Sequence, residues 1–272
     1  MAKLKYRLTN DILFKLFFVK YPEFLMRLIA LILRIPLDDI KQFQVSNPEI
    51  QAEEIGGKMC RLDIAMRVND QRVNLEIQVG NEYNYDLRSL YYWAREFSAA
   101  LPERGEYADL PRVIVISILG FNLFTCKEYY SEYRAMEVSR HTQLTDRMLL
   151  CYYELRKLPV CLDGEDELML WMHLFKAATD PDLDKLISLG GSVMASAVQA
   201  YRSLTTDEQF RELERMRSKA LHDEASALGK ARREATAKAD AKWQSVVAEK
   251  DSALAEKDAI IAKLLAEPPK KT

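Results

Sequence analysis

The segment 58–79, KMCRLDIAMRVNDQRVNLEIQV, constrains this chain most, because its pattern predicts a β-hairpin. Apolar side chains alternate with polar ones over residues 62–68 and again over residues 73–79, which is the period-two pattern of strands that are buried on one face. Asn69 and Asp70 separate the two runs, and both residue types tolerate the positive φ angles of a two-residue hairpin turn. The sequence therefore predicts an antiparallel strand pair with one apolar and one polar face.

The turn fixes the register of this hairpin. Val68 pairs with Gln71, and the same register places Asp63 opposite Glu76, while Gln78 shares the polar face with both acids. Directly opposed like charges on neighbouring strands destabilise a sheet. A bound divalent cation would account for the pair, since carboxylate oxygens on adjacent strands can hold Mg²⁺ and leave positions for water and a phosphate.

The alternative for these residues is purely structural. Polar side chains often cover a solvated sheet face, and here Arg61, which lies opposite Gln78 in this register, and Arg67 would neutralise the acids. Residue chemistry alone leaves both interpretations open.

Composition, charge and cysteine spacing argue against several other classes of protein. The 272 residues are 49% hydrophobic, which is enough for one main domain with an appendage. The formal charge of −2 and the pI of about 6.1 mean that any DNA contact would come from a local basic patch. The four cysteines form no CxxC pair and the three histidines form no HExxH motif, which argues against zinc and haem sites and for a reduced, cytoplasmic setting.

No membrane segment is expected. The apolar run 24–35 is interrupted by Arg27 and Arg34 and is shorter than the ~20 residues that span a bilayer. The first residues, MAKLKYRLTND, contain no signal-peptide hydrophobic region, so export is not expected either.

The order of predicted elements indicates an α/β sandwich around a mixed sheet. Helices are predicted from Thr9 or Asn10 to about Val19 and over residues 22–35, then an irregular strand at 40–45 and 50–55, the hairpin, a helix at 83–101, and strands at 112–119 and 148–155. Beyond residue 163 the pattern is helical, with helices predicted at 166–178, 181–189, 192–201 and from residue 207 onward.

The segment 215–267 contains no proline and a single glycine, and within it the heptad AEKDSAL is followed at once by AEKDAII. Val247, Leu254 and Ile261 are spaced seven residues apart, as in a coiled coil. Because only two heptads fit well, a solvated single helix is an equal alternative. The last five residues, PPKKT, are expected to be a disordered tail.

Several other polar residues have a structural and a functional interpretation. Asp11 suits the N-terminal end of the first helix through the helix dipole, and it could also belong to a site. Arg88 and Arg95 share one face of the helix at 83–101, either as an exposed face or as phosphate contacts. The aromatic residues of the YYW run at 91–93 suit a core better than a base-stacking surface.

Five blocks of the sequence together resemble the PD-(D/E)XK nuclease family transposases, also called recombination-promoting nucleases. The blocks are TNDILFKLFF (9–18), KMCRLDIAM (58–66), VNLEIQV (73–79), RSLYYWAREF (88–97) and VIVISILGFNLF (113–124). They cover about the first half of the chain, and their order and spacing agree with the family.

The resemblance implies a restriction-endonuclease-like mixed sheet flanked by helices, with an all-helical C-terminal extension. The expected organisation is a nuclease-like domain over residues 1–160, a helical region over 161–214, a long charged helix over 215–267 and the tail at 268–272. The implied activity is DNA cleavage that depends on Mg²⁺ or Mn²⁺ and serves recombination or transposition.

By position, Asp63 and Glu76 match the two acids of the family, and Gln78 takes the place usually held by lysine. Asp11 and Lys15 match the D-x-x-F-K block of the first helix. Leu62 replaces the proline that gives the superfamily its name, and the amide of Gln78 can orient a water molecule but carries no positive charge.

The resulting hypothesis assigns a role to each matched residue. Asp63, Glu76 and the carbonyl of Ile77 bind the cation, and Gln78 positions the nucleophilic water. Lys15 or Lys58 supplies the charge that Gln78 lacks, while Arg88 and Arg95 contact phosphates.

Two-fold association through the C-terminal helix would suit cleavage of both strands of a duplex. A catalytically inactive scaffold or DNA-binding protein that acts through its coiled coil is the rival hypothesis, and a nuclease that cleaves RNA is a third.

Overall fold

The computed structural model describes residues 3–47, 63–80, 83–101, 103–162, 164 and 166–266. The chain divides into two compact units, residues 1–216 and 217–272. The helices are α1 (Asp11–Lys20), α2 (Pro22–Leu33), α4 (Tyr85–Ser98), α5 (Glu167–Lys176), α6 (Asp180–Thr206) and α7 (Glu208–Ala266), and the strands are β1 (Phe43–Val45), β2 (Ile64–Val68), β3 (Gln71–Gln78), β4 (Val113–Leu119), β5 (Tyr130–Tyr133) and β6 (Met148–Glu154).

The strands form one mixed sheet in the order β1-β2-β3-β4-β6-β5. β4 runs parallel to β3 and to β6, and the other neighbours are antiparallel. Every residue of β4 is buried, as expected of a continuous apolar, β-branched run that is covered on both faces. The expected α/β class with a mixed sheet is therefore confirmed.

The hairpin has the predicted turn and register. Val68 pairs with Gln71 and Ile64 with Leu75, and Asn69 adopts a φ of 51°. The predicted strand at 50–55, the first part of the hairpin at 58–62, with Lys58, Arg61 and Leu62, and the tail at 268–272 lie outside the described residues.

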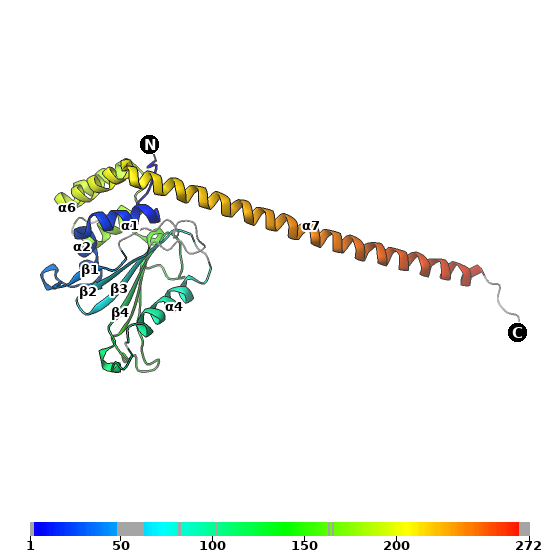
Figure 1. Ribbon diagram of the computed structural model, residues 1–272, viewed down its shortest axis with the longest axis horizontal. Coiled ribbons are helices and arrows are strands. Elements are labelled where there is room, and N and C mark those ends of the chain that lie inside the picture. Colours follow the sequence, from blue (N-terminus) through cyan, green and yellow to red (C-terminus); the bar gives the residue numbers. More distant parts are fainter. Residues whose placement is uncertain are drawn as a thin grey trace. The chain divides into compact units, whose positions relative to one another are not determined.

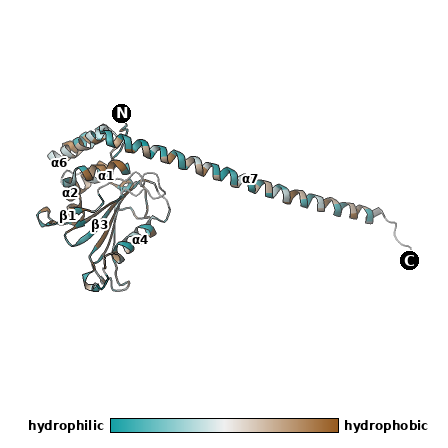
Figure 2. Cartoon of the chain, in the orientation of Figure 1, coloured by the Kyte–Doolittle hydropathy of each residue, from teal (hydrophilic) through white to brown (hydrophobic). Residues whose placement is uncertain are grey.

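Helices cover both faces of the sheet (Figure 1). On one face, the apolar side chains of β2, β3, β4 and β6 pack against α1, α2, α5 and α6 in the main core. Figure 2 shows how apolar α1 is along its length. The other face carries α4 and a smaller core around Tyr85, Val115 and Tyr152. The polar residues of the hairpin lie on this second face.

The start of α1 and the bend in α6 each coincide with a local sequence signal. The side chain of Asn10 accepts a hydrogen bond from the amide of Leu13 and caps α1. The predicted helices 181–189 and 192–201 form the single element α6, which bends at Gly191, a residue with a φ of 58°. β5 was not predicted, because its residues YSEY are only partly buried and carry no clear alternation.

α7 is a continuous helix of 59 residues, and the side chains of Val247, Leu254 and Ile261 on it are exposed. Its coiled-coil pairing remains a prediction, and so do the domain boundaries expected at residues 160 and 214. Among the described helices, none is both long enough and apolar enough to cross a membrane.

Candidate active site

The polar face of the hairpin is buried beneath α4. Glu76 is 6% exposed and Asn74 is 8% exposed, although both side chains stand on the face opposite the main core. The solvated-sheet alternative is therefore wrong for Glu76. A carboxylate at this depth requires a charged or hydrogen-bonding partner, because burial of an isolated charge is strongly unfavourable.

Arg88 is such a partner for Glu76. Its Nη2 atom lies 3.2 Å from Oε1 of Glu76 and 3.0 Å from Oε1 of Gln78, and its guanidinium lies 4.7 Å from the ring centre of Tyr85. α4 brings Arg88 here because Tyr85, Ser89 and Tyr92, spaced three or four residues apart, are its buried residues. The Arg88 guanidinium thus contacts two of the predicted site residues.

Gln78 is the last residue of β3, and both polar atoms of its side-chain amide have a hydrogen-bond partner. Its Nε2 atom donates to the carbonyl of Gly80 at 3.0 Å, while its Oε1 faces Arg88. The backbone carbonyl of Gln78 accepts a hydrogen bond from the amide of Gly120 at 2.8 Å. These contacts fix the direction of the amide.

A row of buried hydroxyl groups extends from Glu76 across the sheet. Ser117 of β4 stands beside Glu76, and Tyr152 of β6 stands beside Ser117. The Tyr85 hydroxyl donates to Ser117 Oγ at 3.0 Å, and the hydroxyls of Ser89 and Tyr152 lie 2.6 Å apart. Burial and then the nearby charge of Glu76 raise the pKa of Tyr85 well above its usual value, so this phenol stays neutral.

Sequence reasoning missed this hydroxyl row. The available signal was Ser117, the single polar residue within the apolar run VIVISIL. A hydroxyl in the middle of a strand that is buried on both faces needs a partner.

Asp63 is the residue directly before β2, next to Ile64, which pairs with Leu75. The hairpin register therefore brings Asp63 level with Glu76 on the neighbouring strand. The side chain of Asn47 fixes this end of β2: Nδ2 donates to the carbonyl of Asp63 at 2.9 Å, and Oδ1 accepts from the amide of Ala65 at 2.8 Å. Asn47 is a second residue that the sequence did not reveal.

The sequence profile of the PD-(D/E)XK nuclease family transposases matches residues 8–231. The chain belongs to this family. The match continues well beyond the first half of the chain, to which the five sequence blocks were confined. No curated protein and no solved structure matches the chain significantly.

Membership of the PD-(D/E)XK nuclease family transposases indicates a nuclease-like protein with DNA as its substrate class, and nucleases of this kind typically use divalent metals. Within the described residues, no three acidic, histidine or cysteine side chains gather in one place. The donors that fit a hard cation here are the carboxylates of Asp63 and Glu76 with a backbone carbonyl, and Mg²⁺ commonly binds one or two carboxylates and keeps several waters. The donor set therefore fits the cation used by the family.

The remaining predicted residues lie in different layers of the protein. Lys15 is fully buried in the middle of α1, and Asp11, half-buried, begins that helix and accepts a hydrogen bond from the amide of Ile12. The side chain of Ile77 belongs to the main core, so only its carbonyl is available as a ligand. The catalytic and metal-binding roles of these residues stay predictions.

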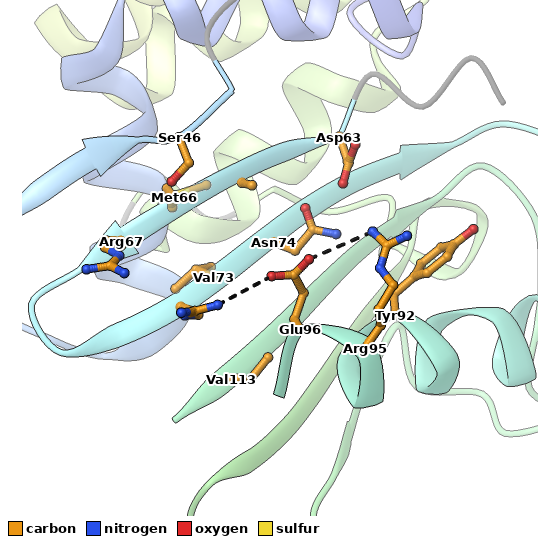
Figure 3. A pocket seen from close by; sticks show the side chains of 12 residues that line it. Ser46, Asp63, Met66, Arg67, Val73, Asn74, Tyr92, Arg95, Glu96 and Val113 are labelled. Atoms are coloured by element: carbon orange, nitrogen blue, oxygen red, sulfur yellow. Dashed lines mark ion pairs between the residues drawn. The ribbon is translucent and has the colours of Figure 1, made fainter. Parts of the chain in front are cut away.

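Arg95 lies further along α4 than Arg88. Its guanidinium lies 5.8 Å from the ring centre of Tyr92 and 3.8 Å from a carboxylate oxygen of Glu96. Arg95 also lines a cavity of about 390 Å³, together with Asp63 and Asn74. The cavity lies on the α4 face of the hairpin, beside Asp63 (Figure 3).

Proposed function

We propose that this chain is a DNA endonuclease that hydrolyses phosphodiester bonds with Mg²⁺ or Mn²⁺, acting in the cytoplasm in recombination or transposition. The observation that supports this best is the almost fully buried Glu76, which is paired with Arg88 and lies beside Gln78 and level with Asp63. A carboxylate pair on adjacent strands with a nearby arginine suits the binding of a cation and a phosphate.

The carboxylates of Asp63 and Glu76 and the carbonyl of Ile77 would hold the cation. When bound, the cation would polarise the phosphate and lower the pKa of a coordinated water. Gln78 would orient the attacking water through the second lone pair of Oε1, since the first faces Arg88 and Nε2 donates to Gly80.

Arg88 has a proposed role before and after the cation binds. In its present position it neutralises Glu76 from 3.2 Å. A divalent cation bound at Glu76 would neutralise the carboxylate in place of Arg88. The released guanidinium could then contact a phosphate oxygen of DNA, because the planar guanidinium suits phosphate oxygens.

Other parts of the proposal rest on the sequence pattern. Asp11 and Lys15 would belong to the catalytic machinery, with Lys15 or Lys58 supplying positive charge that Gln78 lacks. Arg95 would contact a second phosphate. Association of two chains through α7 would supply one site for each strand of a duplex.

Plasmid nicking by the purified full-length protein, with and without Mg²⁺, tests the proposal. Asp63→Asn and Glu76→Gln remove one charge each at nearly constant volume. We expect each to lower the nicking rate by at least ~100-fold, a typical effect for a group that stabilises charge in the transition state. Asp70→Asn, in the exposed turn of the same hairpin, is the matched control and should retain full activity.

The rival hypotheses give different outcomes in the same assay. A folded protein that shows no cleavage with Mg²⁺ or Mn²⁺ would support the inactive scaffold or DNA-binding protein. Preferential cleavage of RNA in a mixture of RNA and DNA would support the RNA nuclease.

A further inference from the structure

The hydroxyl of Tyr85 lies between Glu76 and the neighbouring strand. The Tyr85 side chain is 1% exposed. Its hydroxyl oxygen lies 3.0 Å from Oγ of Ser117, and it is also hydrogen-bonded to the carboxylate of Glu76. The pairing of β3 with β4 places Ser117 directly beside Glu76. This buried hydroxyl therefore has two acceptors within reach of its single proton.

The backbone before α4 and the ring of Phe121 fix Tyr85 in this place. Tyr83 and Asn84 have φ angles of 49° and 60°, a left-handed conformation that is uncommon for residues other than glycine. Tyr85 follows them as the first residue of α4. Its ring meets that of Phe121 edge-on, with the ring centres 6.0 Å apart and an interplanar angle of 82°. The position of the ring therefore does not depend on the hydroxyl.

Tyr85 differs from Arg88, the other partner of Glu76, in its charge. Arg88 and a divalent cation would compete for the same carboxylate, so the proposed function requires Arg88 to move when the cation is bound. Burial and then the charge of Glu76 raise the pKa of Tyr85 well above its usual value, so the phenol stays neutral. A neutral hydroxyl does not repel a cation, and Tyr85 can remain beside Glu76 in both states.

The hydroxyl can compensate Glu76 for the loss of Arg88. An ionised carboxylate is a stronger acceptor than a hydroxyl group. Once Arg88 has moved, the proton of Tyr85 can turn from Ser117 to Glu76, and Ser117 can donate to the phenol oxygen in exchange, because a serine hydroxyl both donates and accepts. Carboxylates that bind a metal are commonly held by such hydrogen bonds from a surrounding layer of residues.

We propose that Tyr85 is a positioning residue of the cation site: its hydroxyl, supported by Ser117, holds the Glu76 carboxylate in the orientation that binds the cation after Arg88 has moved. The inference rests on the proposed function, because it concerns the same metal site. Tyr85 acts through Glu76. Its loss should therefore change the affinity for the cation more than the rate of cleavage once the cation is bound.

Calorimetric titration of the full-length protein with Mn²⁺ tests this role in the absence of DNA. Tyr85→Phe keeps the ring and removes the hydroxyl, and it should weaken Mn²⁺ binding by about 10-fold, a typical effect of losing a contact to a metal ligand. In the nicking assay, the Mn²⁺ concentration for half-maximal activity should rise by the same factor, while the rate at saturating Mn²⁺ should approach that of the wild type.

Tyr201→Phe is the matched control. Tyr201 is also buried, and its hydroxyl donates to the backbone carbonyl of Tyr6, so the variant loses one buried hydrogen bond away from the site. It should leave the affinity for Mn²⁺ unchanged.

Ser117→Ala tests the same hydroxyl from its other side, and it replaces Tyr85→Phe if urea unfolding shows that Tyr85→Phe does not fold. It should weaken Mn²⁺ binding by a smaller factor than Tyr85→Phe. In the double variant, Ser117→Ala should add nothing to the effect of Tyr85→Phe, because Ser117 acts through a hydroxyl that is already absent.

Unchanged Mn²⁺ affinity in a folded Tyr85→Phe protein, or in its Ser117→Ala replacement, would overturn the positioning role and leave the proposed nuclease standing. Equal weakening in Tyr85→Phe and Tyr201→Phe would also overturn it, since both would then reflect a general loss of stability. Additive effects in the double variant would overturn the support from Ser117. A wild-type protein that binds no Mn²⁺ would contradict the proposed metal-dependent nuclease itself, and the role of Tyr85 with it.

Discussion

The ion pair between Glu76 and Arg88 is nearly enclosed by protein. The side chain of Glu76 is 8% exposed and that of Arg88 is 22% exposed, so water screens their attraction poorly. Removal of one member of a buried ion pair usually destabilises a protein by more than the intact pair stabilises it, because the other charge is left buried without a partner. A divalent cation at Glu76 would remove the need for Arg88.

Arg88→Met tests this exchange. With its competitor gone, Glu76 should bind Mn²⁺ about 10-fold more tightly at pH 8, equivalent to about 1.4 kcal/mol, and DNA cleavage should become slower because a phosphate contact is lost. Calorimetric titration with Mn²⁺ and the nicking assay measure the two effects. Unchanged Mn²⁺ affinity in a folded Arg88→Met protein would show that Arg88 does not compete with the cation.

Asn47 is predicted to be a positioning residue for Asp63. Asn47→Ala removes the hydrogen bonds to the carbonyl of Asp63 and to the amide of Ala65, and should destabilise the protein by about 1–3 kcal/mol. The Mg²⁺ concentration for half-maximal nicking should rise, because Asp63 is held less firmly.

Asn47→Asp separates positioning from general destabilisation. It can still accept from Ala65 but cannot donate to Asp63, so its Mg²⁺ requirement should stay raised while part of the stability returns. Gln44→Ala, at an exposed residue of the preceding strand, is the control. A Mg²⁺ requirement equal to that of the wild type in both Asn47 variants would contradict the assignment.

At the scale of elements, the site depends on how closely the ends of β3 and β4 approach each other. Gly120 follows β4, and its amide donates to the carbonyl of Gln78. A Cβ atom at Gly120 would lie 3.1 Å from Cα and 3.2 Å from the carbonyl oxygen of Val79, both of them backbone atoms that cannot rotate away.

Gly120→Ala should therefore destabilise the protein by about 1–3 kcal/mol, as overpacking does, and should lower cleavage by displacing Gln78. Gly80→Ala is a well-matched control, since a Cβ atom there meets nothing within 4 Å. Urea unfolding and the nicking rate measure both variants. Equal behaviour of the two alanine variants would show that this contact does not position the site.

α2 and α5 are joined by the pair of Arg27 and Glu167. Arg27 donates through Nε and, at 2.7 Å, through Nη2, and the Trp171 indole adds a hydrogen bond at 3.2 Å. Burial tends to raise the pKa of Glu167, but the hydrogen bonds from Arg27 and Trp171 outweigh it, so the pKa lies below its usual value. The stabilisation is therefore present above the unfolded-state pKa and is lost as the pH falls through the lower, folded-state pKa.

Glu167→Gln should reduce the free energy of unfolding at pH 7 by no more than ~1 kcal/mol, because the pair is partly exposed to solvent. The difference from the wild type should begin to shrink as the pH falls below the unfolded-state pKa of about 4.3 and should vanish below the lower, folded-state pKa. Urea unfolding between pH 3 and pH 7 measures it, with Glu137→Gln, in the loop pair with Arg140, as the control. A difference that does not depend on pH would contradict the assignment.

At the scale of the whole molecule, α7 leaves apolar side chains exposed at a spacing of seven residues. Val247 is 53% exposed, Leu254 is 60% exposed and Ile261 is 53% exposed. A helix that exposes such a stripe gains stability when a second copy covers it. This is the physical basis of the proposed homodimer.

Leu254→Lys places a charge at the centre of this stripe in the full-length chain. If α7 forms a coiled coil, the variant should become monomeric at micromolar concentration, and conversion of plasmid to the linear form should fall relative to nicking. Ala255→Lys adds the same charge one residue away from the stripe and should leave the dimer intact. Sedimentation velocity measures the mass, and a monomeric wild-type protein would contradict the proposed homodimer.

The sequence by itself determined what depends on near neighbours in the chain. Alternation over the hairpin, with Asn69 in its turn, specified two strands and their register, because side chains in a strand alternate between faces and a two-residue turn leaves a single pairing. The apolar run of β4 specified a strand covered on both faces, and Thr9 or Asn10 marked the start of α1. The same register placed Asp63 level with Glu76 before any tertiary contact was known.

Only the tertiary structure decided which residues surround those carboxylates. The burial of Glu76, its pairing with Arg88, the hydroxyl row through Ser117 and the cavity at Asn74 all arise where α4 packs on the sheet, and Asn47 reaches Asp63 from a segment 16 residues away. No local periodicity encodes such contacts, because they depend on how separate elements pack. The sequence pattern of the hairpin predicted the residues of the candidate site, and the packing of α4 on the sheet determined their burial and their partners.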